Sequence, residues 1–110
     1  MPYNLDLEDR IDRLATRLGD VNKKKMFGGV GYMLNGNMCF GIHKESLMLR
    51  VSPEQGEKLL KNEYIRPFDM MTRNPMKGWV LVSPDAVETE EQLSDMLQLG
   101  LDYAGTLPKK

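Results

Sequence analysis

Residues 31–51 read GYMLNGNMCFGIHKESLMLRV, and the turn signals within this stretch decide the fold. Asn35-Gly36 is the strongest short signal for a β-hairpin, because a type I′ turn needs a positive φ at both central positions. Residues 43–46 then return the chain as a four-residue loop. We therefore predict a three-stranded antiparallel meander over residues 26–34, 37–42 and 47–51.

The two turns also predict which residues pair across the strands. They place Met33 opposite Met38, Gly31 opposite Phe40, and Cys39 opposite Arg50. Because side chains alternate across a sheet, the paired residues divide between two faces. The predicted core face holds Met33, Met38, Phe40, Ile42, Leu47, Leu49 and Val51. The predicted second face holds Val30, Tyr32, Leu34, Cys39, Met48 and Arg50.

Three helices and two further strands surround the meander. Residues 5–18 carry apolar side chains at helical spacing, with Asn4 or Asp6 as the cap. Ser52 and Pro53 open a short second helix, and the TEEQ stretch at 89–92 is a capping box for a third helix. Residues 63–71 form an extended segment that Pro67 restricts to an edge, and residues 79–83 form a strand.

The third helix is expected to bury one face, which carries Leu93, Met96, Leu97, Gly100, Leu101 and Ala104. The order is therefore helix, three strands, helix, two strands, helix. This order predicts a two-layer α+β fold in which a five-stranded antiparallel sheet carries its helices mainly on one face.

Bulk composition fits one domain over residues 1–110. The formal net charge is -1, so no global field draws the chain to nucleic acid or to anionic lipid. A single cysteine fits a reducing compartment, and no apolar run approaches the ~20 residues that cross a bilayer. The polar N-terminus is no secretory signal. We expect a cytoplasmic protein without membrane contact.

The glycines of KMFGGVG, residues 25–31, raise the question of a phosphate site. Phosphate loops open a helix, whose N-terminus receives the anion. Here strand and hairpin follow instead, so a phosphate loop is rejected. We expect Gly28 and Gly29 to bend the sheet, and Gly31 to leave room for the ring of Phe40.

Catalytic chemistry finds little support in the residues. His43 is the only histidine and lies in a turn, without partners at metal-ligand spacing. Cys39 lacks a base that would activate its thiol, although Arg50 opposite it could stabilise a thiolate. We expect no enzyme, no cofactor and no metal site.

Two binding surfaces are consistent with the sequence. The first is the second face, because five strands and three helices leave it without helical cover. A slip of the strand register, or a helix that folds over this side, would remove this surface instead. It predicts docking of a protein partner or a second copy of the chain through Tyr32, Cys39, Met48, Arg50 and Trp79. The alternative is a nucleic-acid surface, with Phe68 and Trp79 among its cations. Those cations are Lys23, Lys24, Lys25, Arg66, Arg73 and Lys77.

The combination KKKMFGGVGYMLNGNMCFGI, LMLRV, PFDM and PMKGWVLVSPDAV resembles the N-terminal domain of the TfoX/Sxy family of bacterial proteins. The likeness runs from about Leu5 to Pro108, and it is closest to short, stand-alone members. Arg73-Asn74 stands where close relatives tend to have Gly-Arg. The motif residues are Lys25, Met26, Phe27, Gly28, Gly29, Gly36, Arg50, Val51, Phe68, Lys77, Gly78 and Trp79.

The resemblance implies a fold similar to that of secretion chaperones, with the same element order. It also implies a regulatory module without catalytic residues. Two-domain members are positive regulators of competence genes that work with a transcription activator. We therefore expect a stand-alone regulatory or adaptor module that acts by protein–protein interaction.

Overall fold

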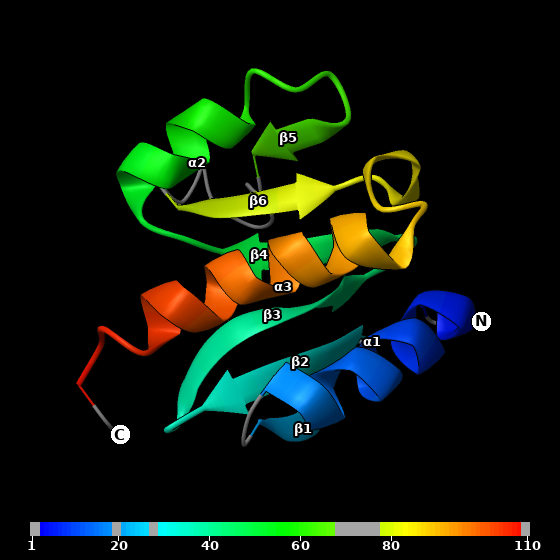
Figure 1. The fold of residues 1–110 in the computed structure, drawn as a ribbon, viewed down its shortest axis with the longest axis vertical. Helices are drawn as coiled ribbons and strands as arrows, with labels where there is room; N and C mark the ends of the chain where they lie inside the picture. The colour runs from blue at the N-terminus through cyan, green and yellow to red at the C-terminus, as the bar shows by residue number, and fades with distance from the viewer. Residues whose placement is uncertain (1–2, 19–20, 27–28, 68–77, 109–110) are drawn as a thin grey trace.

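A computed structural model describes residues 3–18, 21–26, 29–67 and 78–108 (Figure 1). Within these segments, none of the helices is long and apolar enough to cross a membrane. The elements are α1 Leu5–Leu18, β1 Asn22–Met26, β2 Gly29–Leu34, β3 Asn37–His43, β4 Ser46–Arg50, α2 Pro53–Leu59, β5 Ile65–Pro67, β6 Trp79–Val82, the 3₁₀ turn η1 Pro84–Ala86, and α3 Glu90–Ala104.

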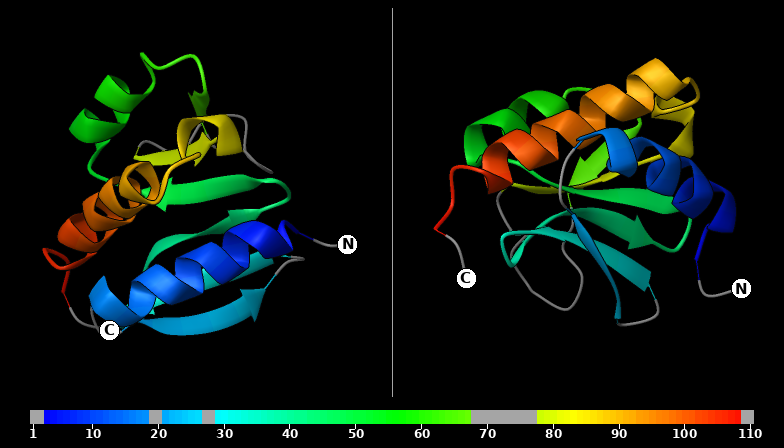
Figure 2. Two further views of the ribbon diagram at one scale, coloured as in Figure 1. Left: turned by 45° about the vertical axis from the view of Figure 1, so that its right-hand side comes forward. Right: turned by 60° about the horizontal axis from the view of Figure 1, so that its bottom comes forward.

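The strands form one antiparallel sheet in the order β1-β2-β3-β4-β6-β5. The helices lie together on one side of it (Figure 2, right). The two-layer α+β prediction is confirmed, with six strands in place of the expected five. The additional strand is β1, which contains the three lysines that come before the predicted meander. Lysine is a poor strand former but is common on sheet edges, where β1 lies.

The turns agree with the sequence in type, although one is shorter than expected. Asn35 and Gly36 have φ values of 56° and 84°, which confirms the type I′ hairpin. Between β3 and β4, His43 pairs with Ser46, so the connection has two residues and not four. Lys44 takes the positive φ of 56° that this tighter turn requires.

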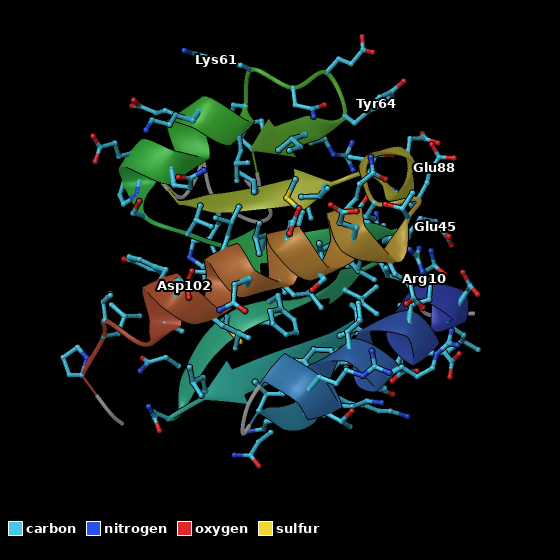
Figure 3. The ribbon with its side chains drawn as sticks, viewed as in Figure 1. Arg10, Glu45, Lys61, Tyr64, Glu88 and Asp102 are labelled. Carbon is cyan, nitrogen blue, oxygen red and sulfur yellow. The ribbon has the colours of Figure 1, made fainter. Side chains whose placement is uncertain are left out.

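The expected helix caps are present. The Asn4 side chain accepts a hydrogen bond from the Leu7 amide at 3.1 Å, and the Asn4 amide donates to the Lys44 carbonyl at 2.9 Å. Ser52 caps α2, and Thr89 with Gln92 forms a full capping box on α3. Arg10 of α1 donates to the Val87 carbonyl at 2.6 Å, which joins α1 to the start of α3 (Figure 3).

The pairing of β2 with β3 begins in the predicted register and then slips by one residue. Met33 lies opposite Met38 as expected, but Tyr32 lies opposite Phe40, so Cys39 is an extra residue on β3. This β-bulge moves the partner of Gly31 from Phe40 to Gly41. Because β3 carries the extra residue, Met38 before it and Phe40 after it point to opposite faces of the sheet.

Because of the bulge, several residues lie on the face of the sheet opposite to the one predicted. Phe40, Ile42, Leu47, Leu49 and Val51 are core residues, as predicted. The second-face assignment was wrong for four residues that belong to the core or pack against it: Val30, Tyr32, Cys39 and Leu34. The core assignment was wrong for Met38, which packs with Met48 on the other side, and for Met33, which is half-buried and outside the core cluster.

α3 crosses the sheet directly over the bulge. Leu93, Leu97, Leu101 and Ala104 are buried along the predicted face of the helix. A Cβ atom added to Gly100 would overlap the carbonyl oxygen of Cys39 and would lie 3.0 Å from Leu49 Cδ1. Gly100 therefore permits a helix-to-sheet approach that any larger residue would block.

We expect Gly100→Ala to lower the free energy of unfolding by about 1–3 kcal/mol, because the added methyl group would overlap the backbone carbonyl of Cys39. Urea denaturation followed by circular dichroism measures the loss. Gly105→Ala is the matched control, since a Cβ there would lie 3.3 Å from the nearest atom and its φ is -66°. Equal stability of the two variants would contradict this account.

Candidate functional site

The second face of the sheet is the side opposite the helices, and one row of paired residues runs across all of its strands. The register joins Lys24 to Gly31, Gly31 to Gly41, and Gly41 to Met48. It continues from Met48 to Leu81 and from Leu81 to Arg66. The row therefore begins and ends with a cation on an edge strand, and the residues between them are small or apolar.

Four apolar side chains form a cluster at the centre of this face, which we call the methionine cluster: Met38, Met48, Trp79 and Leu81. The Cε atoms of Met38 and Met48 both lie close to Gly41, each 3.1 Å from where its Cβ would be. Met48 and Leu81 are buried, at 9% and 6% exposed, whereas Met38 and Trp79 are half-buried. The surface of the cluster is therefore mainly that of Met38 and Trp79.

Arg50 lies beside the methionine cluster, between two aromatic rings. Its Cζ atom is 5.3 Å from the centre of the Trp79 ring and 5.8 Å from the centre of the Tyr103 ring. Such cation–π contacts fix the plane of a guanidinium and leave its N–H groups at the edge. The two rings thus fix the position of the Arg50 guanidinium.

Tyr32 was predicted on the second face, and this placement was wrong. Its ring lies in the core against Phe40, with centroids 5.2 Å apart. Its hydroxyl donates to Asp12 Oδ1 at 2.6 Å, which ties β2 to α1. Burial raises the pKa of the Tyr32 hydroxyl, and the hydrogen bond to Asp12 and its charge raise it further. Tyr32 therefore holds the fold together and is not accessible to a partner.

Lys23 belongs to the same polar network. Its ammonium contacts Glu8 Oε2 at 2.7 Å and Asp12 Oδ2 at 2.9 Å, and the Tyr3 hydroxyl donates to Glu8 at 3.0 Å. The hydrogen bond from Lys23 lowers the pKa of Glu8, against the opposing effect of burial. Burial lowers the pKa of Lys23, but the hydrogen bonds to both carboxylates outweigh it and the pKa is raised. Lys23 thus pairs β1 with α1.

Cys39 was also predicted on the second face, and this placement was wrong. The residue is fully buried at the bulge, and its thiol donates to the Tyr32 carbonyl at 3.1 Å. Burial raises the pKa of the thiol to about 12, so the thiol is protonated at neutral pH. His43 is half-buried at the end of β3, and burial, Lys44 and Arg66 together lower its pKa.

The described basic residues of the expected nucleic-acid surface lie on opposite edges of the sheet. Lys24 and Lys25 are exposed on β1, and Arg66 is exposed on β5 at the opposite edge of the sheet. Arg73, Lys77 and the neighbouring Phe68 lie outside the described residues, as do Phe27 and Gly28 of the glycine stretch.

The glycine stretch itself leads into a strand, as expected. Met26 pairs with Gly29 in antiparallel strands, and β2 begins at Gly29. The described element that follows the glycines is a strand, and not a helix whose N-terminus could bind a phosphate. In the segments that the structure describes, no three His, Cys, Asp or Glu side chains gather in an arrangement that could hold a metal ion.

Sequence reasoning missed Met38 on this surface and the contact that Arg50 makes with Tyr103. Met38 was placed in the core because the bulge has no signature in the residue types around Cys39. Tyr103 was not expected near Arg50, because Arg50 is on a strand and Tyr103 is in the last turn of α3. The pairing of Arg50 with Trp79 follows directly from the strand register.

Comparison with models of known protein families gives one match for this chain. The sequence model of the TfoX N-terminal domain matches residues 12–104 of the 110. No curated protein matches the chain. The matched range includes the second half of α1, the whole described sheet and α3.

We expect Tyr32→Phe to lower the free energy of unfolding near pH 7 by about 1–2 kcal/mol, because Asp12 loses a buried donor. The raised pKa of Tyr32 stabilises the fold below the ordinary tyrosine value of about 10, and this contribution declines as pH rises above that value. The difference between the two proteins should therefore shrink in alkali. Urea titrations at neutral and alkaline pH measure it, and a difference independent of pH would contradict the assignment.

Proposed function

Because the chain belongs to the TfoX N-terminal domain family, we propose that it is a non-enzymatic regulatory or adaptor module that acts by binding a protein. The partner is another protein or a second copy of the chain. The second face of the sheet is the binding surface. Its contacts are Arg50, Trp79 and Met38, with Met48 beneath them. Tyr32 and Cys39 are no longer part of the proposed surface, because both are buried in the core.

The observation that supports this proposal most directly is the position of Arg50 between Trp79 and Tyr103 beside the methionine cluster. Arginine, tryptophan, tyrosine and methionine are enriched at protein interfaces relative to the rest of a surface. Aromatic and arginine side chains also contribute most of the binding energy at such sites. The sheet holds these residues at fixed spacing, so little entropy is lost when a partner binds.

Nucleic-acid binding is the alternative, and the placement of the cations favours it less. Lys23 is already paired with two carboxylates, and Lys24 is separated from Arg66 by the width of the sheet. A nucleic-acid surface needs a continuous basic stripe with aromatic faces free for bases. Here one face of the Trp79 ring is occupied by Arg50.

Photo-crosslinking from the second face tests the proposal. We expect a benzoylphenylalanine introduced in cells at position 38 to form a covalent adduct with one protein, because Met38 is half-buried at the surface of the methionine cluster. Mass spectrometry identifies the adduct, and light scattering shows whether it is a second copy. The control carries the same crosslinker at Glu57, which is exposed on α2.

Adducts that form equally from both positions, or from neither, would contradict a specific protein interface on the second face. Retention on heparin that falls steeply with salt, together with no adduct at position 38, would favour the nucleic-acid alternative.

A further inference from the structure

The charges of this chain are divided between its two layers. The described strands contain no Asp or Glu, and they carry five basic residues: Lys23, Lys24, Lys25, Arg50 and Arg66. The three α-helices carry ten acidic residues against four basic ones. The net charge of -1 is therefore the sum of a positively charged sheet and a negatively charged helix layer.

The anionic layer is most uniform on α3. This helix has four acidic residues and no basic one: Glu90, Glu91, Asp95 and Asp102. Figure 3 looks onto this layer and shows Asp102 on the outer side of α3. Acidic ligands are repelled from this side of the molecule, since like charges raise the energy of approach.

Three of the strand cations belong to the second face. Lys24 and Arg66 stand at the two ends of the row that crosses the sheet, and both are exposed. Arg50 belongs to the same face, because it pairs with Trp79 of the methionine cluster. The ion pairs found within the described segments involve Arg13 and Lys23 and none of these three cations. Lys23, on the side facing α1, has two.

The spacing of these cations sets the size of a matching ligand. Six strands at about 4.8 Å separation place the ends of the row about 24 Å apart. About 24 Å is the length of a helix of roughly 16 residues or of an extended segment of roughly seven. The space between the cations is apolar, because it is occupied by the methionine cluster and two glycines.

We propose that the second face binds an acidic protein segment whose carboxylates pair with Lys24, Arg50 and Arg66 and whose apolar side chains cover Met38 and Trp79. This inference rests on the proposed function and names the chemistry of its partner. Arg50 binds its carboxylate through two parallel N–H donors, because the flanking rings fix the orientation of the planar guanidinium. The two edge cations set the orientation of the segment and speed its approach.

A nucleic acid is the less suitable anion for this face. Its phosphates repeat at short intervals, whereas the three cations are spread over the width of the sheet around an apolar centre. Single-stranded bases need an open aromatic ring on which to stack, and Arg50 covers one face of Trp79. An acidic segment with apolar residues between its carboxylates satisfies both parts of the surface.

The test is binding of a fluorescent synthetic peptide of Glu and Leu to the full chain, measured by anisotropy. A peptide with Gln in place of Glu and a single-stranded oligonucleotide serve as competing ligands. We expect the Glu peptide to bind more tightly than either, and its affinity to fall at least tenfold in the double variant Lys24→Glu/Arg66→Glu. Added salt should weaken binding, because exposed charges are screened.

The matched control is Arg17→Glu/Lys58→Glu, which changes the net charge equally but on exposed positions of the helix layer. This control should keep the affinity of the unaltered chain. Thermal unfolding of both double variants establishes that each is folded. An equal loss of affinity in the two variants would overturn the inference, because it would reflect net charge alone.

Three other outcomes would also overturn it. The Gln peptide could bind as tightly as the Glu peptide, or the oligonucleotide could bind more tightly than both and lose affinity in Lys24→Glu/Arg66→Glu. A specific crosslink from position 38 to a protein segment without acidic residues would overturn this inference and leave the proposed function intact.

Discussion

The extra residue that β3 carries at Cys39 determines how the two layers of this protein fit together. The bulge turns Tyr32 toward the helices, where its hydroxyl reaches Asp12 of α1, and turns Met38 toward the other face. It also brings the Cys39 carbonyl outward against α3 at the one position where that helix has a glycine. One local irregularity thus sets the contacts of both long helices.

The polar network between α1 and the sheet explains why a run of lysines forms a strand. An isolated strand of three lysines would be unfavourable, since the side chains repel one another and none packs well. Here β1 pairs with β2 along its whole length, and Lys23 is held by Glu8 and Asp12. Lys24 and Lys25 remain exposed, and charged side chains on an edge strand oppose unwanted pairing with other chains.

Much of the fold could be predicted because its signals are local. Asn35-Gly36 fixes a turn through backbone φ alone, Thr89 and Gln92 cap α3 through contacts three residues apart, and Pro67 excludes β5 from the centre of the sheet. The bulge at Cys39 could not be predicted, because its cause is non-local: Tyr32 gains a partner on α1 and α3 packs on the displaced carbonyl. The same slip removed two of five residues from the predicted binding surface.

The corrected surface differs in chemistry from the one that alternation predicts. A face with Val30, Tyr32 and Leu34 would be broadly apolar and would suit a hydrophobic self-association. With those residues in the core, the face has a small centre of methionine, leucine and tryptophan, and its exposed groups are cations. A second copy would have to present its own anionic helix layer to this face, an unlike-to-unlike contact that does not close into a symmetric dimer. The division of charge therefore favours a different, acidic protein over a second copy as the partner.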